Sequence, residues 1–188
     1  GILKLDFGSG ANAANLISAT SGLVLNGGSL VVTGAASGSA QTFAATTLNQ
    51  GSAVITATGA NTNLTLGAIT RALGGTLNVN LPTGGAVNVT GADGLIGGWA
   101  NVNGNTFATL SSGALAGLSA GSYTANTWTA GATVDATTSS LPTADSTINA
   151  FRVNAPAIVT LAGLNTITSG GILVGNGLST GLAALNGG

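Results

Sequence analysis

The feature that most constrains the fold of this chain is a set of short, regularly spaced runs in which apolar and polar residues alternate. Gly, Asn-Gly or Gly-Gly bounds most of these runs. Period-two alternation with turn residues at both ends predicts β-strands rather than helices. The clearest runs are Leu23–Leu25, Leu30–Thr33, Ala53–Thr56, Leu64–Leu66, Leu77–Leu81 and Ala86–Thr90.

The spacing of the runs predicts how the strands are arranged. One series of similar tripeptides recurs after 23 and 24 residues, and an interleaved series of dipeptides recurs after 21 and 23. The first is Gly28-Ser29-Leu30, Gly51-Ser52-Ala53 and Gly75-Thr76-Leu77; the second is Thr42-Phe43, Asn63-Leu64 and Ala86-Val87. A period of about 20–25 residues with two or more strands fits one coil of a parallel β-helix, or β-solenoid, whose strands stack about 4.8 Å apart.

We therefore predict an all-β parallel β-helix in which Leu30, Ala53 and Leu77 occupy successive coils and point the same way. The Leu, Val and Ile side chains of such coils form ladders inside the solenoid, while Asn and Thr lie outside or at the turns. An antiparallel β-sandwich remains the alternative, because steps of about 11 residues between strands also occur and are typical of that fold.

The texture of the chain changes at Gly97. Both Trp residues, the single Tyr and one Phe fall between Trp99 and Trp128. We predict solenoid coils over 1–96, an insertion or irregular coil with a small aromatic core over 97–147, and solenoid coils again over 148–188 that continue beyond the segment.

Charge is the compositional outlier. Only 4% of the residues are charged, against about 25% in a typical globular domain, while 44% apolar residues exclude ordinary disorder. Three basic residues give no footprint for nucleic acid or anionic lipid. The uncharged stretch 72–92 contains Asn, Gly and Pro throughout, which argues against membrane insertion.

Composition also bears on location. A surface of Thr, Ser, Asn and Gly suits an extracellular protein or a subunit covered in an assembly. The absence of Cys is compatible with export through a narrow outer-membrane pore. The chain starts at Gly1 without a basic leader region, and we interpret it as a processed or excised part of a longer product.

Several segments carry a resemblance to a known family. They are the phrases Gly97–Thr109 and Ala144–Asn154, followed by Val159–Leu161 and Asn165–Val174. In these the chain resembles the autotransporter-associated β-strand repeat proteins, very long exported passenger-type proteins of planctomycete, verrucomicrobial and proteobacterial genomes. The resemblance implies a right-handed parallel β-helix, export, and a cell-surface or extracellular location in a bacterium. It implies no shared active site.

The residues that carry most enzyme chemistry are missing. His, Cys and Glu are absent, which excludes thiolate or imidazole metal sites and Ser-His-Asp or Cys-His catalysis. The Gly-rich stretch Gly94–Gly98 lacks the Lys of a phosphate-binding loop, and no acidic residue follows Gly8–Ala13 at the distance that holds a ribose. We predict that the chain is not an enzyme and has no catalytic residue, no bound cofactor and no metal.

Four Asp residues are the only acids. Asp6 lies in the first predicted strand, and Asp93 in a Gly-Ala-Asp-Gly turn that we expect it to cap through its own backbone. Asp135 and Asp145 could meet and hold a cation, but separate structural roles are favoured. Arg71 and Arg152 are expected to be solvated or paired with Asp.

Two classes of function survive, with a third far behind. The first is a structural segment of an extracellular or cell-surface fibre, stalk or sheath built from stacked solenoid units. The second is an adhesin or glycan-binding module that displays 97–147, where Trp99, Tyr123 and Trp128 would stack on sugars if exposed, although a small core is favoured. The third is a polysaccharide-active enzyme.

The partner expected for a structural segment is the chain itself. Neither end shows an obvious polar cap: Gly1–Leu5 is a mostly apolar strand, and Leu178–Gly188 is uncharged. Uncovered strand edges attract further strands. We therefore predict head-to-tail self-assembly, or stacking on flanking repeats of the same polypeptide, with surface glycans as the other candidate partner.

Overall fold

The computed structural model describes residues 1–8, 13–140, 145–178, 181 and 183–187. It is 53% strand and 3% helix and consists of stacked parallel coils, which confirms the predicted β-solenoid over the antiparallel sandwich. The chain divides into two compact units, each described below by itself. Unit 1 comprises residues 1–96 and 108–116, and unit 2 comprises residues 97–107 and 117–188.

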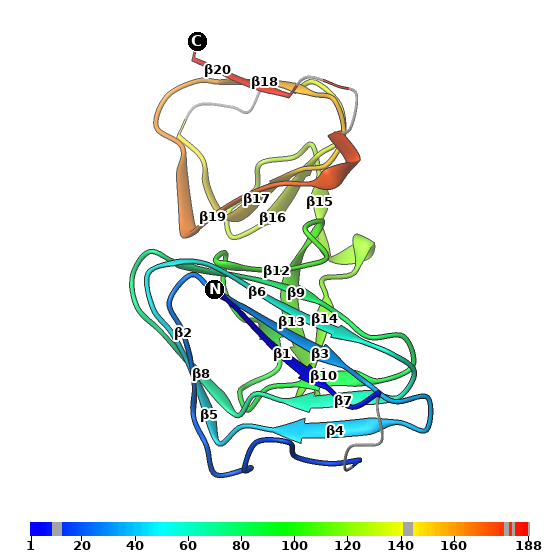
Figure 1. The fold of residues 1–188 in the computed structure, drawn as a ribbon. Helices are drawn as coiled ribbons and strands as arrows, with labels where there is room; N and C mark the ends of the chain where they lie inside the picture. The colour runs from blue at the N-terminus through cyan, green and yellow to red at the C-terminus, as the bar shows by residue number, and fades with distance from the viewer. Residues whose placement is uncertain (9–12, 141–144, 179–180, 182, 188) are drawn as a thin grey trace. The chain divides into compact units, whose positions relative to one another are not determined.

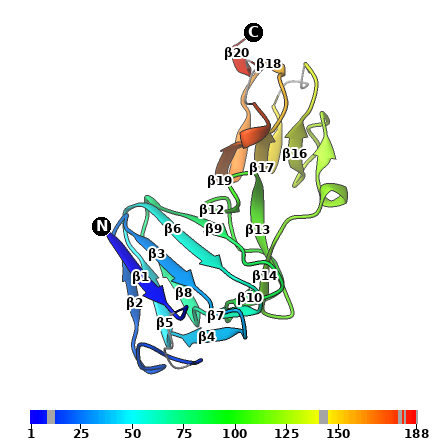
Figure 2. The same ribbon diagram turned by 45° about the vertical axis from the view of Figure 1, so that its right-hand side comes forward.

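Unit 1 contains three parallel sheets that the chain visits in turn in every coil. Its strands lie side by side in Figures 1 and 2 in the order of their coils. The first sheet is β1 (Ile2–Asp6), β3 (Ser29–Thr33), β6 (Gly51–Thr58) and β9 (Gly75–Asn80). The second is β4 (Ser39–Thr42), β7 (Thr62–Thr65) and β10 (Ala86–Asn88). The third is β2 (Leu23–Leu25), β5 (Ala45–Leu48) and β8 (Ala68–Arg71).

Apolar ladders fill the interior of unit 1. In the first sheet, Leu30, Ile55 and Val79 stack in register on successive strands, and all three are fully buried. The alternate residues of these strands point outward, where Asn80 donates a hydrogen bond to the Thr56 hydroxyl of the preceding coil. The two-residue alternation of the sequence therefore separates the core from the polar outer face.

The prediction that Leu30, Ala53 and Leu77 occupy successive coils and point the same way is confirmed, since they lie on β3, β6 and β9 and all three are buried. Their spacing gives the direct pairing of side chains for only one of the two pairs of coils. Ala53 lies opposite Leu77, but Leu30 lies opposite Ile55, two residues further along β6 than Ala53. The reason is strand length: β6 has eight residues and β3 has five, so β3 begins opposite Val54, the fourth residue of β6. Because side chains alternate with period two, a shift of two keeps every residue on its predicted face.

The second predicted series behaves in the same way. Val87 lies opposite Leu64, as its spacing predicts. Leu64, however, lies opposite Gln41, whereas the spacing predicted Phe43. The inward side of these strands is again as predicted, since the shift is two residues.

Antiparallel strands end the parallel stacking of the second sheet in unit 1. β14 (Ala114–Gly117) meets β10 in an antiparallel bridge between Asn88 and Ala114. β11 (Gly94–Leu95) pairs antiparallel with β13 (Thr106–Ser111). A parallel coil therefore does not follow β10 in this sheet.

Unit 2 is a second parallel stack with its own core. One sheet contains β15 (Thr124–Ala125), β16 (Thr133–Ala136), β17 (Thr147–Val153) and β19 (Thr166–Val174), and another pairs β18 (Ile158–Leu161) with β20 (Ala184–Gly187). Single 3₁₀ turns occupy Ala120–Ser122 and Asn176–Leu178. Val134, Phe151 and Val159 belong to the core, and the Trp128 ring lies 5.1 Å from that of Phe151.

The predicted insertion at 97–147 contains both parallel strands of the unit 2 stack and an antiparallel pair. Its residues 124–125 and 133–136 form parallel strands in register with each other and, for β16, with β17. Residues 97–107 include β12 (Ala100–Val102), which pairs antiparallel with the start of β13. The backbones of Gly98 and Gly171 touch so closely that a Cβ atom on either would overlap the other, which fixes this segment against β19.

A buried glutamine anchors residues 13–17 along β4 in unit 1. The Gln41 side chain is fully buried; its Oε1 accepts the Ile17 N–H at 3.2 Å, and its Nε2 donates to the Ile17 carbonyl at 2.9 Å. A parallel bridge joins Ala14 to Ala40, and the Asn15 side chain accepts the Thr42 N–H at 2.9 Å. This segment covers the first strand of the second sheet, so that sheet has a local cap that the sequence did not reveal.

Replacing Gln41 with Leu tests this cap. The change keeps the volume but leaves the Ile17 N–H and C=O without their side-chain partners. Because Ile17 is half-buried, the loss per group lies below the roughly 1–3 kcal/mol that a fully buried polar group costs. We expect faster hydrogen exchange at the Ile17 amide and easier proteolysis within 13–17, with the rest of unit 1 intact. The exposed Gln50→Leu is the matched control. Equal exchange rates at Ile17 in both variants would contradict the cap.

Candidate assembly surfaces

An uncovered apolar surface lies on the last described strands of unit 2. The inward ladder that runs through Val134 and Phe151 ends at Ile172, and the one through Ala136 and Val153 ends at Val174. Phe151 is fully buried, but Ile172 is 55% exposed and Val174 65%. These two side chains therefore occupy core positions with no further coil over them in the part of the chain that the structure describes.

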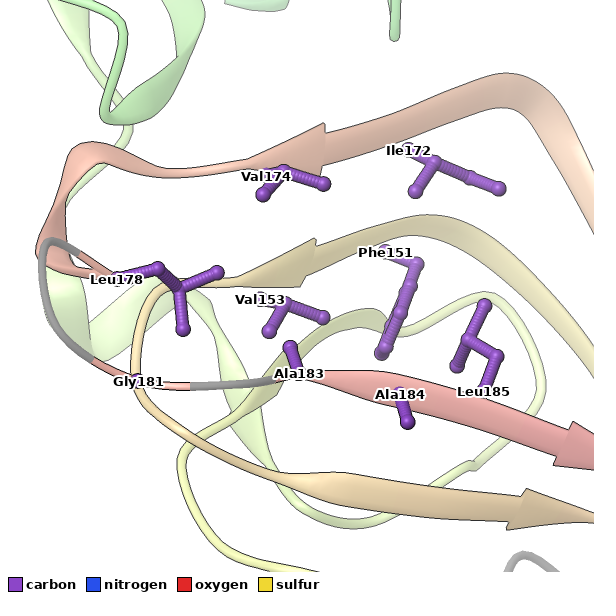
Figure 3. A pocket seen from close by; sticks show the side chains of 9 residues that line it. All are labelled: Phe151, Val153, Ile172, Val174, Leu178, Gly181, Ala183, Ala184 and Leu185. Atoms are coloured by element: carbon purple, nitrogen blue, oxygen red, sulfur yellow. The ribbon is translucent and has the colours of Figure 1, made fainter.

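A cavity opens among these side chains. It has a volume of about 330 Å³. Figure 3 shows Ile172 and Val174 on β19 pointing to the same side as Phe151 and Val153 on β17, with Leu185 of β20 facing them. Leu185 continues the ladder of buried Val159 on the opposite sheet and is 47% exposed. We call Ile172, Val174 and Leu185 the trailing face of unit 2.

The matching position in unit 1 is its first strand. Leu3 stacks inward on the fully buried Leu30 yet is 45% exposed, whereas Leu5 stacks on Val32 and is buried. A shallow hollow of about 370 Å³ adjoins Leu3 and the start of β2. We call Leu3 and the edge of β1 the leading face of unit 1. Leu5 and Phe7, which follow Leu3 on the same side, are buried, so Leu3 is the exposed inward side chain of β1.

One ion pair lies beside the leading face. Lys4 and Asp6 point to the outer side of β1, with Nζ and Oδ2 2.8 Å apart. The hydrogen bond from Lys4 lowers the pKa of Asp6, and the backbone N–H of Gly8 lowers it further. Both side chains are exposed, so solvent screens this pair and it contributes little to stability.

The other predicted acid–base residues have separate partners. Asp145 accepts the Leu164 N–H at 2.9 Å, while Asp135 binds Arg152, so the two carboxylates that were considered for a cation are engaged elsewhere. Asp93 is exposed directly before β11. The Arg71 Nε donates to the Gly75 carbonyl at 2.7 Å.

Arg152 makes several polar contacts within unit 2. Its Nε donates to Asp135 at 3.0 Å, its Nη2 binds the other carboxylate oxygen, and its Nη1 donates to the Asn105 carbonyl at 3.2 Å. The guanidinium carbon lies 3.8 Å from the centre of the Tyr123 ring. Burial lowers the pKa of Arg152, but the hydrogen bonds and electrostatic attraction from Asp135 and Tyr123 together outweigh it, and the pKa is raised. This confirms pairing with Asp for Arg152 and identifies a structural role.

Two of the three aromatic side chains considered for sugar binding make internal contacts in unit 2. Tyr123 is buried, and its hydroxyl is 2.8 Å from the Thr106 hydroxyl and accepts the Phe107 N–H at 3.0 Å. Trp128 packs on the core around Phe151. Trp99 is half-buried. The favoured prediction of a small aromatic core thus matches Tyr123 and Trp128, which lie against different parts of unit 2.

Sequence reasoning missed the trailing face, although a signal for it was present. Ile172, Leu173 and Val174 are three apolar residues in a row, a pattern typical of strands buried on both faces. Leu173 is indeed buried on one face, and its neighbours form the uncovered surface on the other.

Two familiar kinds of feature are absent from the described ranges. No cluster of three or more His, Cys, Asp or Glu side chains able to hold a metal ion occurs there. Within the same ranges no helix has the length and apolar character that crossing a bilayer requires.

Comparisons with known proteins do not identify a relative. No family model matches the chain, and no curated protein or solved structure was found to be similar to it. The resemblance to autotransporter-associated repeat proteins stays a prediction, and the conclusion from the molecule itself is its fold: the chain is a β-solenoid that leaves core side chains of its last coil uncovered.

Proposed function

We propose that this chain is a structural segment of an extracellular or cell-surface bacterial fibre, stalk or sheath built from stacked β-solenoid units. The observation that carries the proposal is the trailing face: Ile172, Val174 and Leu185 are inward-facing ladder positions whose side chains are 47% to 65% exposed. A surface of this kind is stabilised when another coil covers it.

The energetics favour such stacking. Burying apolar surface is worth about 25 cal/mol per Å², and each unit of a solenoid is stabilised mainly by its immediate neighbours. The formal net charge of the chain is −1, so electrostatic repulsion between stacked copies is weak. The outer faces carry mainly Thr, Ser, Asn and Gly, which gain little free energy from burial. Apolar burial therefore favours association through the ends.

The competing functions receive less support from the same residues. A glycan-binding module needs exposed aromatic rings, whereas Tyr123 and Trp128 are committed to internal contacts. A polysaccharide-active enzyme of the ordinary kind needs two carboxylates flanking one bond. Asp135 is bound to Arg152, and Asp145 to a backbone amide. An assembly role, unlike these two functions, accounts for the exposed inward-facing side chains of the trailing and leading faces.

Electron microscopy and fibre diffraction of the purified chain test the proposal. We expect ordered filaments with strands perpendicular to the long axis and a reflection near 4.8 Å. Labelling of intact cells with an antibody against the chain should reveal the same filaments at the surface. A chain that stays monomeric at high concentration, together with an absence of surface labelling, would rule the proposal out.

A further inference from the structure

The uncovered strands at the two ends of the chain present complementary edges. Among the described residues, β19 is the last strand of its sheet and β1 the first strand of its own. Each sheet grows strand by strand along the chain in parallel orientation. Crossovers between parallel strands are right-handed in about 98% of cases, so in both sheets each new strand is added on the same side of the previous one. The next strand after β19 must therefore pair through the edge that is opposite to its own following strand, and this is the edge that is free on β1.

The side chains of the two strands match in spacing. The inward residues of β19 at the trailing face are Ile172 and Val174, two positions apart, and the inward residues of β1 are Leu3 and Leu5, also two apart. Placing Leu3 against Ile172 and Leu5 against Val174 continues both aliphatic ladders from one molecule into the next. It also brings the exposed Leu3 onto the exposed Ile172.

Neighbouring registers satisfy the same surfaces less well. A slip of one residue turns the Lys4 side chain toward the apolar ladder, where a charge without a partner is costly. A slip that sets Leu3 against Val174 places Gly1 at Ile172, and Ile172 then has no side chain over it. The opposite slip of two sets Leu3 against Gly170, which offers it no side chain to cover.

We propose that β1 of a second copy of this chain adds in parallel to β19, with Leu3 opposite Ile172 and Leu5 opposite Val174. The inference rests on the proposed function and specifies its contact. Because the two surfaces differ, the contact is heterologous: each copy keeps one free face of each kind, and addition does not close on itself unless a ring forms. The resulting filament is polar, with all copies pointing the same way.

Engineered cysteines test the register directly, since the chain has none of its own. Residues opposite each other on adjacent strands have Cα atoms about 4.8 Å apart, within the range of about 4.4–6.8 Å that a disulfide spans. We would mix the single variants Leu3→Cys and Ile172→Cys and oxidise the mixture. A second matched pair is Leu5→Cys with Val174→Cys. The offset controls are Leu3→Cys with Val174→Cys and Leu5→Cys with Ile172→Cys, in which the Cα atoms would lie beyond about 7 Å.

We expect mixed dimers from both matched pairs and at least tenfold less from the offset pairs. Each single variant alone should give few dimers, because symmetric Leu3–Leu3 or Ile172–Ile172 contacts are not part of the interface. Filaments without matched cross-links would overturn this contact and leave the proposed function standing. Matched cross-links without filaments would support the contact and count against the fibre. Cross-links within single variants would indicate a symmetric dimer and overturn the proposal.

A charge substitution provides an independent measurement without oxidation. Leu3→Lys should reduce the proportion of large species at least tenfold, because it inserts a charge into the contact. Ile2→Lys is the matched control, since Ile2 is 76% exposed and lies on the outer side of β1. Circular dichroism should show both variants folded. If Leu3→Lys assembles as well as Ile2→Lys, the leading face is not the partner of β19.

Discussion

Replacing Val79 with Asp is expected to unfold unit 1 as a block. Val79 is fully buried and stacks on Ile55, which in turn stacks on Leu30, so the carboxylate would enter the interior of the apolar ladder. A buried carboxyl group without a partner costs on the order of several kcal/mol. That is a large part of the roughly 5–15 kcal/mol that stabilises a typical domain. Because neighbouring coils stabilise one another, the loss spreads to β3, β6 and β9 together.

Chemical denaturation and limited proteolysis measure this effect. The same substitution at Val24 is the matched control, since that side chain is 59% exposed on the outer side of β2. Val87→Asp repeats the test in the second sheet, where Val87 is fully buried against Leu64. If the denaturation midpoint and the protease-resistant fragments of Val79→Asp match those of Val24→Asp, the inward ladder is assigned wrongly.

The sequence contains enough to predict the coils of unit 1. Its strands are separated by Gly-rich turns at a steady period, and alternation assigns each residue to the core or the surface. What the pattern could not supply was strand length. The tripeptide that begins at Gly51 looks like the one that begins at Gly28. Gly51, however, lies three residues before Val54, where the pairing of β6 with β3 begins. Similar turns therefore do not guarantee equivalent positions in the ladder.

Unit 2 was harder to predict because its coils vary in length. From Val134 to Phe151 the chain advances 17 residues, and from Phe151 to Ile172 it advances 21. A search for a period of 21–24 residues passes over the shorter coil, which explains why β16 fell inside the predicted irregular region. For the same reason the sequence could not show that Asp135 and Arg152 lie directly opposite each other on adjacent strands.

At the ends of the solenoid, too, the sequence predicted some features and not others. The lack of a charged cap was visible in the composition, but the covering of β4 by residues 13–17 depends on the amide of one buried Gln41. Charges placed at both Leu3 and Leu5 would not test assembly cleanly. Leu5 is buried within its own unit, so a charge there would disturb folding, and Leu3 alone provides a clean test.

The second large effect is expected from Asp135→Ala in unit 2. Removing the carboxylate leaves the Arg152 guanidinium buried among Tyr123 and the Asn105 carbonyl, which do not neutralise its charge. Breaking a buried ion pair from one side costs about 3–5 kcal/mol, chiefly because the remaining charge is uncompensated. Thermal or chemical denaturation should therefore show a strong loss of stability confined to unit 2, with the unit 1 transition in place.

Two further variants separate the charge effect from a simple loss of packing. Adding Arg152→Met to Asp135→Ala removes the stranded charge, so the double variant should recover part of the stability lost by the single one, as buried pairs replaced by apolar side chains often do. Asp6→Ala is the matched control for an exposed pair, and no measurable change is expected there because both partners are in solvent. If the double variant is no more stable than Asp135→Ala alone, the loss comes from packing around β16 and not from the buried charge of Arg152. In that case the contacts of Arg152 with Asn105 and Tyr123 would be a consequence of the fold of unit 2. They would not be a source of its stability.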